Sequence, residues 1–144
     1  MLGKLYENQN CSASRALEVV GERWSLLILR DAMFTGCTRF SQFQKSLGVA
    51  TNILAKRLED FVEAGLMEHR PGVAGEQAEY VLTRMGLEMM PTIIALSEWG
   101  DKWSPRPGPV FYSDKADGQP LKLQLQRADD GRPVDVADVG VTLR

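Results

Sequence analysis

Apolar side chains return every three or four positions through the first half of this 144-residue chain, which predicts a series of amphipathic helices. We expect Ser12 and Thr51 to cap two of them, since a hydroxyl can accept a hydrogen bond from a free N–H of the first helical turn. Only residues 48–50 separate the last two helices, so that pair is predicted to be a helix-turn-helix. The expected helices run from Ser12 to Gly21, from about Arg23 to Phe34, from Phe40 to Leu47 and from Thr51 to just before Gly65.

After Gly65 the pattern changes from helical spacing to that of two short strands. Residues 66–70 and 78–82 are predicted to pair as a β-hairpin, with the glycine-containing loop 71–77 between them. A helix-turn-helix followed by a β-hairpin is the element order of a winged-helix domain. The sequence therefore predicts a mainly α fold of the α+β class, a winged helix-turn-helix whose wing is this hairpin.

A long apolar helix is predicted after the hairpin, capped by Thr83 and running to about Trp103. Its apolar residues cover more than half of its circumference, so one side remains for a partner after the helix has packed on its own domain. Pro91 should kink this helix or begin its second part. We expect a dimer interface on this helix, formed by Met90, Ile94, Trp99 and Trp103.

Prolines between residues 105 and 109 mark a boundary after this helix. Residues 1–104 are predicted to form the winged-helix domain, and residues 105–144 a short C-terminal β-rich extension. Within the extension, residues 121–127 alternate between apolar and polar, which predicts a half-buried strand. The valines between residues 134 and 141 suggest one or two further short strands.

Composition excludes several classes of protein. Hydrophobic residues make up 44% of the chain and charged residues 25%, as in ordinary soluble domains. Neither a membrane-spanning run nor a signal peptide is found, so we expect a cytoplasmic protein with no membrane partner. The two cysteines form no disulfide framework and no Cys/His cluster is present, which predicts no metal site. Because His69 is the only histidine, we expect no catalytic residues, no enzyme activity and no cofactor.

The distribution of charge is the most informative feature of the sequence. The formal net charge is −2 and Asp and Glu together number 19, yet residues 32–58 contain none of them. A basic, acid-free helix-turn-helix in an acidic chain indicates a surface that meets phosphate, so DNA binding is expected. The alternative is a charged face that contacts only solvent. The basic residues of this stretch are Arg39, Lys45, Lys56 and Arg57.

In a helix-turn-helix, the second helix enters the major groove and its first residues lie near the base edges. Opposite the apolar stripe of that helix lie Asn52, which can bond adenine, and Lys56, which can bond guanine or a phosphate. Thr51 can contact a phosphate or a thymine methyl, serve only as a helix cap, or do both. Contacts to the DNA backbone are expected from Arg39, Ser41, Gln42 and Arg57. The alternative for Arg57 is an ion pair with Glu18, Glu59 or Asp60.

Cys11 stands at the start of a predicted helix, where backbone N–H groups and the helix dipole favour a thiolate. The hypothesis is a redox or electrophile sensor, and the alternative is that Cys11 and Cys37 are one incidental and one buried cysteine. Trp24, Trp99 and Trp103 are expected in the core or in an interface, with a pocket for a flat aromatic effector as the alternative.

Three segments together resemble the HxlR-type regulators, a branch of bacterial winged-helix transcription factors related to the MarR group. The segments are CSASRALEVVGERWSLLILRDAM, TRFSQFQKSLGVATNILAKRLEDFVEAGLMEHR and EYVLTRMGLEMMPTIIALSEWGDKW. The resemblance covers Cys11 to Trp103. It implies a homodimer joined through its terminal helices, with two winged helices that bind a pseudo-palindromic operator. It also implies a response to oxidants or electrophiles through Cys11, since several such proteins respond through a cysteine at the matching position.

One departure from the family concerns the wing. Relatives often carry an arginine just before the second wing strand, whereas this chain has Glu76-Gln77-Ala78. An acidic wing tip would be repelled by the minor groove, so readout by the wing is not expected. The segment after Trp103 is also longer than in the shortest members, and it can cover the core, extend the dimer interface or shape an effector pocket.

The sequence thus predicts a homodimeric, sequence-specific transcriptional regulator, more often a repressor than an activator. Its expected partners are double-stranded DNA, a second copy of the chain and a small-molecule effector. One rival is a winged-helix module that binds protein instead of DNA through Met89, Met90 and Trp99. The other is a small enzyme built on one of the cysteines, for which His69 lies too far along the fold to act as a base.

Overall fold

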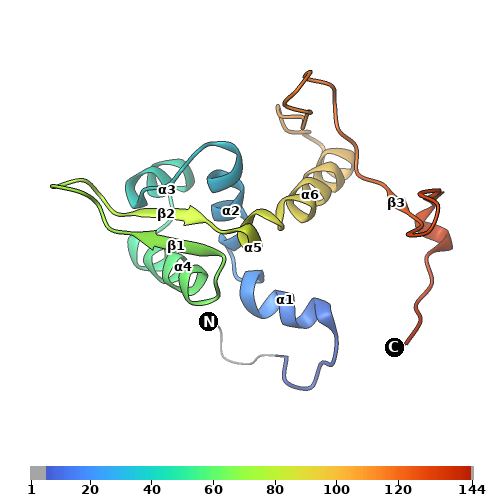
Figure 1. The fold of residues 1–144 in the computed structure, drawn as a ribbon, viewed down its shortest axis with the longest axis horizontal. Helices are drawn as coiled ribbons and strands as arrows, with labels where there is room; N and C mark the ends of the chain where they lie inside the picture. The colour runs from blue at the N-terminus through green and yellow to red at the C-terminus, as the bar shows by residue number, and fades with distance from the viewer. Residues whose placement is uncertain (1–5, 144) are drawn as a thin grey trace. The chain divides into compact units, whose positions relative to one another are not determined.

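The structure, a computed structural model, describes residues 6–143 and divides into two compact units, one ending at Ile93 and the other beginning at Ile94. In its described residues, the first unit contains five complete helices, one hairpin and the beginning of a sixth helix (Figure 1). In chain order these are α1 (Ser12–Val20), α2 (Ser25–Phe34), α3 (Phe40–Leu47), α4 (Thr51–Glu63), β1 (Met67–Arg70), β2 (Glu79–Leu82), α5 (Arg84–Leu87) and the start of α6 (Met90–Trp103).

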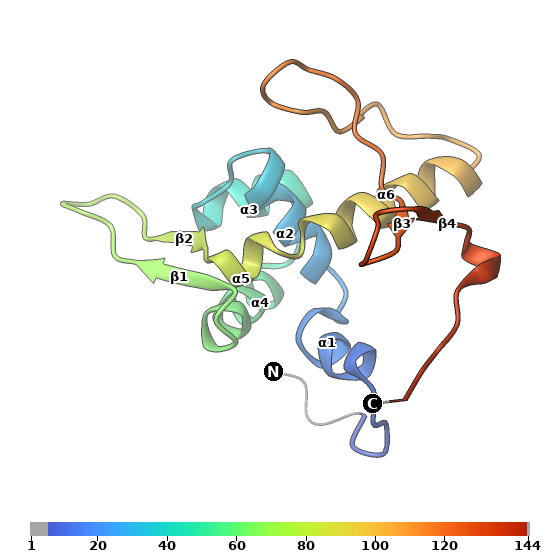
Figure 2. The ribbon, with the colours of Figure 1, turned by 45° about the vertical axis from the view of Figure 1, so that its right-hand side comes forward.

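The core of the first unit lies between α2, α3, α4 and the hairpin (Figure 2). Leu54, Leu58 and Phe61 line the inner face of α4, and none of them is more than 1% exposed. Their spacing of four and three residues places them on one stripe of the helix, as predicted. Phe43 of α3 is fully buried against this stripe. Since burial of one such side chain contributes about 1.5–3 kcal/mol, these contacts fix the position of α4.

The ends of three helices differ from the predictions. Cys11, not Ser12, caps α1, because its Sγ accepts a hydrogen bond from the backbone N–H of Ser14 at 3.3 Å. The second helix starts at Ser25 rather than Arg23, because Trp24 adopts a φ of 79°, which lies outside the helical region. Ala50, not Thr51, is the N-terminal cap residue of α4, because its extended backbone ends the turn that Gly48 begins with a φ of 63°. Thr51 is the first helical residue.

The hairpin matches the prediction. Its strands are antiparallel, with Met67 opposite Leu82 and Arg70 opposite Glu79. A backbone hydrogen bond of 2.7 Å from the Tyr80 N–H to the Thr38 carbonyl joins β2 to the chain just before α3. The wing is therefore attached to the helix-turn-helix by main-chain contacts, which makes its base part of the same rigid scaffold.

The predicted long helix is divided in two. Thr83 caps only α5, accepting a hydrogen bond from the Gly86 N–H at 3.2 Å, and α5 ends at Leu87. The second helix, α6, begins at Met90. Pro91 is its second residue, where a missing N–H costs nothing because the first turn has no intrahelical acceptors for it. The prediction that Pro91 begins a second segment is confirmed, and the continuous helix is wrong.

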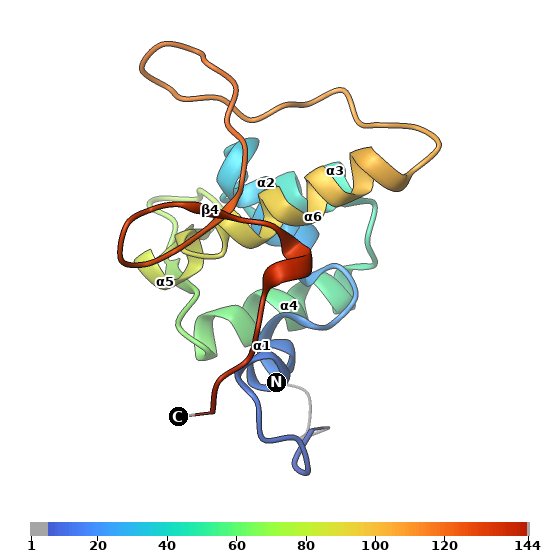
Figure 3. The ribbon, with the colours of Figure 1, turned by 90° about the vertical axis from the view of Figure 1, so that its right-hand side faces the viewer.

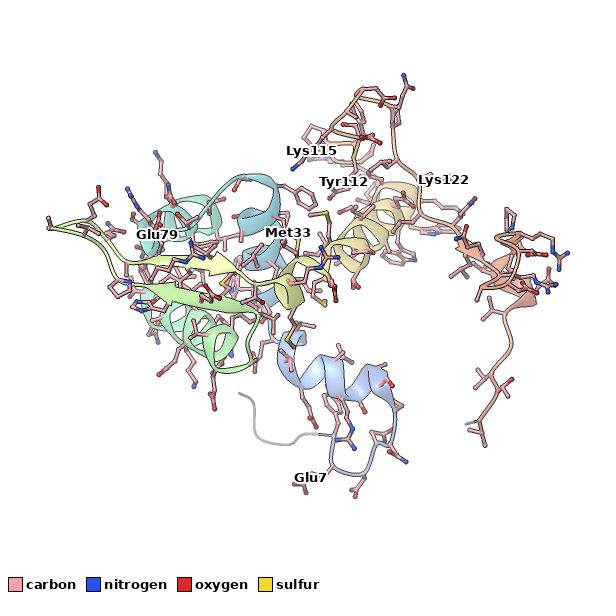
Figure 4. The ribbon with its side chains drawn as sticks, viewed as in Figure 1. Glu7, Met33, Glu79, Tyr112, Lys115 and Lys122 are labelled. Atoms are coloured by element: carbon pink, nitrogen blue, oxygen red, sulfur yellow. The ribbon has the colours of Figure 1, made fainter. Side chains whose placement is uncertain are left out.

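The second unit consists of the rest of α6 and an extension with little regular structure (Figure 3). Its two strands, β3 (Leu125–Gln126) and β4 (Pro133–Val134), are antiparallel and only two residues long, and a 3₁₀ turn, η1 (Val136–Asp138), follows them. The extension is tied to α6 by a 2.9 Å hydrogen bond between the hydroxyls of Tyr112 and Ser97 (Figure 4).

The half-buried strand predicted for residues 121–127 is wrong except for β3 near its end, whereas β4 is one of the one or two short strands predicted between residues 134 and 141. Leu121 and Leu125 are 50% and 51% exposed, and only the last part of the segment pairs. Alternation creates an apolar face but a strand also needs a partner along its length, which β4 supplies for two residues only. The functional boundary after residue 104 stays a prediction.

Candidate nucleic-acid interface

The acid-free stretch, residues 32–58, runs from the end of α2 through α3 and the following turn into the first half of α4. Thr51 and Asn52 are exposed in the first turn of α4, and Lys56 is 54% exposed one turn further on. No side chain caps the α4 N-terminus, so its first N–H groups point outward together with the positive end of the helix dipole. The core stripe of α4 turns this polar face away from the rest of the unit. These three features make the start of α4 a surface suited to an anionic partner.

Lys56 is held by Asp60, one turn further along α4. The Nζ atom lies 2.9 Å from the carboxylate of Asp60, which is 9% exposed, and this hydrogen bond raises the pKa of Lys56 above its usual value. The lysine therefore keeps its positive charge at any physiological pH. In this ion pair Asp60 is buried but Lys56 is exposed, so the ammonium group of Lys56 still faces solvent on the polar side of α4.

Arg57 lies on the inner side of the same turn. Its side chain is 16% exposed, and its guanidinium pairs with Glu22 at 2.9 Å and with Asp60 at 3.0 Å. Of the alternatives weighed for Arg57, the ion pair with Asp60 is confirmed, and Glu22 rather than Glu18 or Glu59 is the second partner. These pairs connect α4 to the segment between α1 and α2. Whether Arg57 also reaches the DNA backbone stays a prediction.

Arg39 stands at the entrance to α3 between two carboxylates of the wing. Its guanidinium lies 3.9 Å from Glu76 and 3.8 Å from Glu79, and its side chain is 40% exposed. The backbone of Glu79, in β2, also forms an isolated antiparallel β-bridge with that of Arg39. Figure 4 labels Glu79. Ion pairs this long and this exposed are weak, about 0–1 kcal/mol, so a phosphate can compete with them.

Ser41 and Gln42 connect the start of α3 to its surroundings. The Oε1 atom of Gln42 accepts hydrogen bonds of 2.9 Å from the backbone N–H groups of Thr38 and Arg39, which satisfies two free donors before the helix. The Ser41 hydroxyl donates to Oε1 of Gln77 at 2.9 Å. Gln77 and Glu79 thus contact predicted interface residues, although nothing in the sequence pattern shows which wing residues meet α3.

The two cysteines differ in their surroundings. Cys11 is exposed. Hydrogen bonding by the Ser14 side chain, which has the larger effect, and by the Ser14 backbone N–H holds the pKa of the Cys11 thiol below its usual value. Cys37 is buried, and its Sγ lies 3.2 Å from the hydroxyl of Thr35. Of the two, Cys11 is the thiol available to solvent. Among residues 6–143, no group of three His, Cys, Asp or Glu side chains is placed to hold a metal ion.

The residues predicted for a dimer interface fall into two classes. Trp99 and Trp103 are 65% and 64% exposed on α6, whereas Ile94 is 8% exposed and Met90 is half-buried. Trp24 packs against the core of the first unit, where the Arg23 guanidinium lies 5.2 Å from its ring centroid. Within the described part of the chain, no helix has the length and apolar character needed to cross a membrane.

Residues 19–107, more than half of the chain, match the model of the family described as HxlR-like helix-turn-helix. An uncharacterized HTH-type transcriptional regulator of Mycobacterium bovis is 43% identical over 114 residues, covering 78% of this chain and 66% of the relative. The chain thus spans just under two thirds of the length of that relative. An uncharacterized HTH-type regulator of Synechocystis is 30% identical over 96 residues, covering 65% of this chain and 70% of the relative.

Solved structures share the winged-helix fold. The crystal structure of PA1607, a candidate transcription factor, is 43% identical with a TM-score of 0.81, and the match covers 92% of this chain and 94% of that one. PA1374 from Pseudomonas aeruginosa, also a candidate transcription factor, is 35% identical with a TM-score of 0.65, over 93% and 92% of the two chains. The reduced form of the redox regulator HypR is similar in fold alone, at 22% identity and a TM-score of 0.58 over 64% and 92%.

Proposed function

Because the chain belongs to the HxlR-like helix-turn-helix family, whose matched members are named transcriptional regulators, we propose that it binds a specific double-stranded DNA sequence and acts as a repressor. The observation that supports this most is that α3, the turn and the first half of α4 contain no acidic residue, although carboxylates of the wing and Asp60 lie beside Arg39 and Lys56. In a chain with a formal net charge of −2, a segment whose only charged side chains are basic supports contact with phosphate. The proposal includes no catalytic activity.

Two sets of residues have different roles in the proposed complex. With α4 in the major groove, Asn52 and Lys56 read base edges and Thr51 contacts a phosphate or a thymine methyl. Arg39, Ser41, Gln42 and Arg57 contact the DNA backbone, which fixes the orientation of α4 without reading sequence. Arg57 is the most enclosed of them, so its contribution arises mainly from positioning α4 through Glu22 and Asp60.

The proposed complex contains two copies of the chain. Trp99 and Trp103 present a large exposed aromatic surface on α6, of the kind that forms the centre of an interface. Met90 and Ile94 belong to the proposed interface on the same helix, but Ile94 is only 8% exposed and Met90 is half-buried, so the two tryptophans provide most of its surface. Two copies related by a two-fold axis place their α4 helices about 34 Å apart, on successive major-groove faces of a pseudo-palindromic operator.

We also propose that Cys11 makes DNA binding responsive to oxidants or electrophiles. Its exposure and its lowered pKa both favour reaction of the thiolate. Reaction at Sγ removes the acceptor of the Ser14 N–H and with it the cap of α1. Diamide or a quinone should therefore change DNA affinity in the wild-type protein and leave the Cys11→Ser variant unchanged.

The test is fluorescence anisotropy on the duplex upstream of the protein's own gene, at 50 and 200 mM salt, with a scrambled duplex as competitor. We expect binding that survives the competitor and weakens steeply with salt, because each neutralised phosphate releases counterions. Lys115→Ala, in the extension, is the matched control and should leave both properties unchanged. Indifference to sequence and to salt would contradict the proposal.

A second candidate function is a winged-helix module that binds another protein. The exposed aromatic surface of α6 favours it, since Leu96, Trp99 and Trp103 are each more than half exposed. In that case duplex DNA gives no salt-dependent signal, and Trp99→Ala abolishes the complex with the partner protein. The same anisotropy experiment therefore separates the two functions.

A further inference from the structure

An open cavity of about 630 Å³ lies between α4 and the wing hairpin. It lies wholly within the first unit and includes none of the residues assigned above to DNA. Its volume falls in the range of small-molecule sites, about 300–1,000 Å³. The cavity is lined by Ala55, Glu59, Val62 and Glu63 of α4, by His69 of β1 and by Tyr80 of β2.

The two walls of the cavity are held in place by different contacts. The α4 wall consists of residues three and four positions apart, so they lie along one side of the helix, next to the stripe that anchors it in the core. The hairpin wall is a pair of rings. His69 and Tyr80 lie opposite each other in the strand register, and their ring centroids are 5.2 Å apart at an angle of 63°. This edge-to-face contact keeps the two rings at a fixed angle to each other.

Charge in the cavity is of one sign. Glu59 and Glu63 follow each other at a spacing of four residues on α4, where like charges repel each other. Neither Lys nor Arg is among the residues that line the cavity. The two cations that precede the glutamates on α4, Lys56 and Arg57, both pair with Asp60. The pair of carboxylates therefore favours a cation that comes from outside the chain.

The rest of the lining shows what kind of cation fits. Val62 and Ala55 provide apolar surface, and the Tyr80 ring can attract a cation through its π face. A bare metal ion would leave this surface unused, and the described residues hold no group of three metal-ligating side chains. An anionic ligand would be repelled by both glutamates.

We propose that this cavity binds a small organic cation, with an ammonium group at Glu59 and Glu63 and an aromatic or apolar body against Tyr80 and Val62. If the chain is the regulator proposed above, small organic cations are the class of effector that this cavity binds, and that part of the inference rests on the proposed function. Ligand binding itself needs no DNA, so it is measured on the full chain alone. Failure of DNA binding therefore leaves this proposal standing, and the reverse also holds.

The experiment is a titration of the full-length protein with benzyltrimethylammonium, followed by amide chemical shifts. We expect saturable shifts in the second half of α4 and in β1 and β2, with a Kd below about 1 mM. The neutral probe benzyl alcohol should bind at least tenfold more weakly, and phenylacetate should cause no shifts at these positions. Shifts confined to α6, where Trp99 and Trp103 are exposed, would overturn the proposal.

Substitutions on α4 and on the hairpin test whether both walls of the cavity bind benzyltrimethylammonium. The double variant Glu59→Gln/Glu63→Gln should weaken benzyltrimethylammonium at least tenfold and bring it to the level of the neutral probe. Tyr80→Leu keeps an apolar side chain, removes the ring and should weaken binding severalfold. Glu68→Gln is the matched control, because Glu68 lies on β1 next to His69, pairs with Arg70 and is not among the lining residues. Equal affinity in the double variant and in the wild type would overturn the assignment.

Discussion

The two halves of α4 differ in chemistry although they share one core. The first half, from Thr51 to Leu58, has no acidic residue, an uncapped N-terminus and the polar side chains that we assign to DNA. The second half contains Glu59, Asp60 and Glu63, and together with Ala55 it forms a wall of the cavity. Leu54, Leu58 and Phe61 run under both halves. The same packing therefore supports the surface that we propose to bind DNA and the cavity that we propose to bind a cation, a few residues apart, which the sequence pI of about 5.5 does not reveal.

The largest expected effect comes from removing the core that both halves share. Leu58 is fully buried, so Leu58→Ala should lower the free energy of unfolding by about 2–5 kcal/mol through lost burial and the cavity left behind. Urea denaturation measures it. Ile53→Ala, on an α4 residue that is 38% exposed, is the control and should cost less. A loss below about 1 kcal/mol for Leu58→Ala would mean that the two halves do not depend on a common core.

The next effect sharpens the role of the first half. Asn52→Ala and Lys56→Ala should each cost about 1–3 kcal/mol on the specific duplex and relax the preference for it, because each removes a base contact. Competition between the specific and scrambled duplexes measures the ratio. Urea denaturation of Lys56→Ala controls for the loss of the Lys56–Asp60 pair. If affinity for both duplexes fell by the same factor, these residues would be contacting phosphate rather than bases.

Arg39 should affect affinity without affecting sequence preference. Arg39→Ala should weaken all duplexes alike and reduce the slope of log affinity against log salt by about one, because one phosphate contact is lost. Arg84→Ala serves as the control, since Arg84 is an exposed residue of α5 that pairs with Glu88. An unchanged slope for Arg39→Ala would remove Arg39 from the interface and leave it as a partner of Glu76 and Glu79 only.

The N-terminus of α1 offers a comparison with that of α4, because it is capped by a thiol. The hydrogen bonds from Ser14 favour the thiolate, so alkylation of Cys11 in the folded protein should persist to lower pH than in urea. Ser14→Ala should move the midpoint of the alkylation rate upward, toward the unfolded value. A Cys37→Ser background restricts labelling to Cys11. Identical midpoints in folded and unfolded protein would contradict the hydrogen-bonded thiolate.

The smallest effect concerns the acidic half. Glu59→Gln/Glu63→Gln should raise affinity for any duplex about twofold per charge at low salt, since a unit charge about 10 Å from a phosphate contributes about 0.4 kcal/mol in water. Anisotropy at 50 mM salt should detect the gain, and at 300 mM it should disappear because screening shortens the reach of the charge. A gain that persists at high salt would indicate a structural change instead.

Local patterns in the sequence predict most of the first unit. The helical spacing of α3 and α4, the short turn between them and the two hairpin strands follow from residue periodicity, which needs no knowledge of distant contacts. Pro91 marks the start of α6 because proline, which lacks an N–H, is tolerated in the first turn of a helix, and this too is a local property of the sequence. The caps are off by one residue because the thiol of Cys11 and the backbone of Ala50 end their turns, and neither residue type is a usual cap.

What local patterns do not predict is which distant side chains meet. The contacts of Gln77 with Ser41 and of Arg57 with Glu22 join segments that are more than thirty residues apart. The cavity likewise depends on how the hairpin lies against α4. In the extension the alternation of residues 121–127 was insufficient, because a strand forms only where a partner strand runs beside it.

We propose that DNA contacts the first half of α4 and not the second half. Amide chemical shifts of the full-length protein, titrated with the duplex from upstream of its own gene, distinguish the two halves. We expect the largest changes on residues 39–42 and 51–56, with small ones on residues 59–63 and β1. Changes concentrated on the second half of α4 or on α6, with residues 51–56 unaffected, would contradict it.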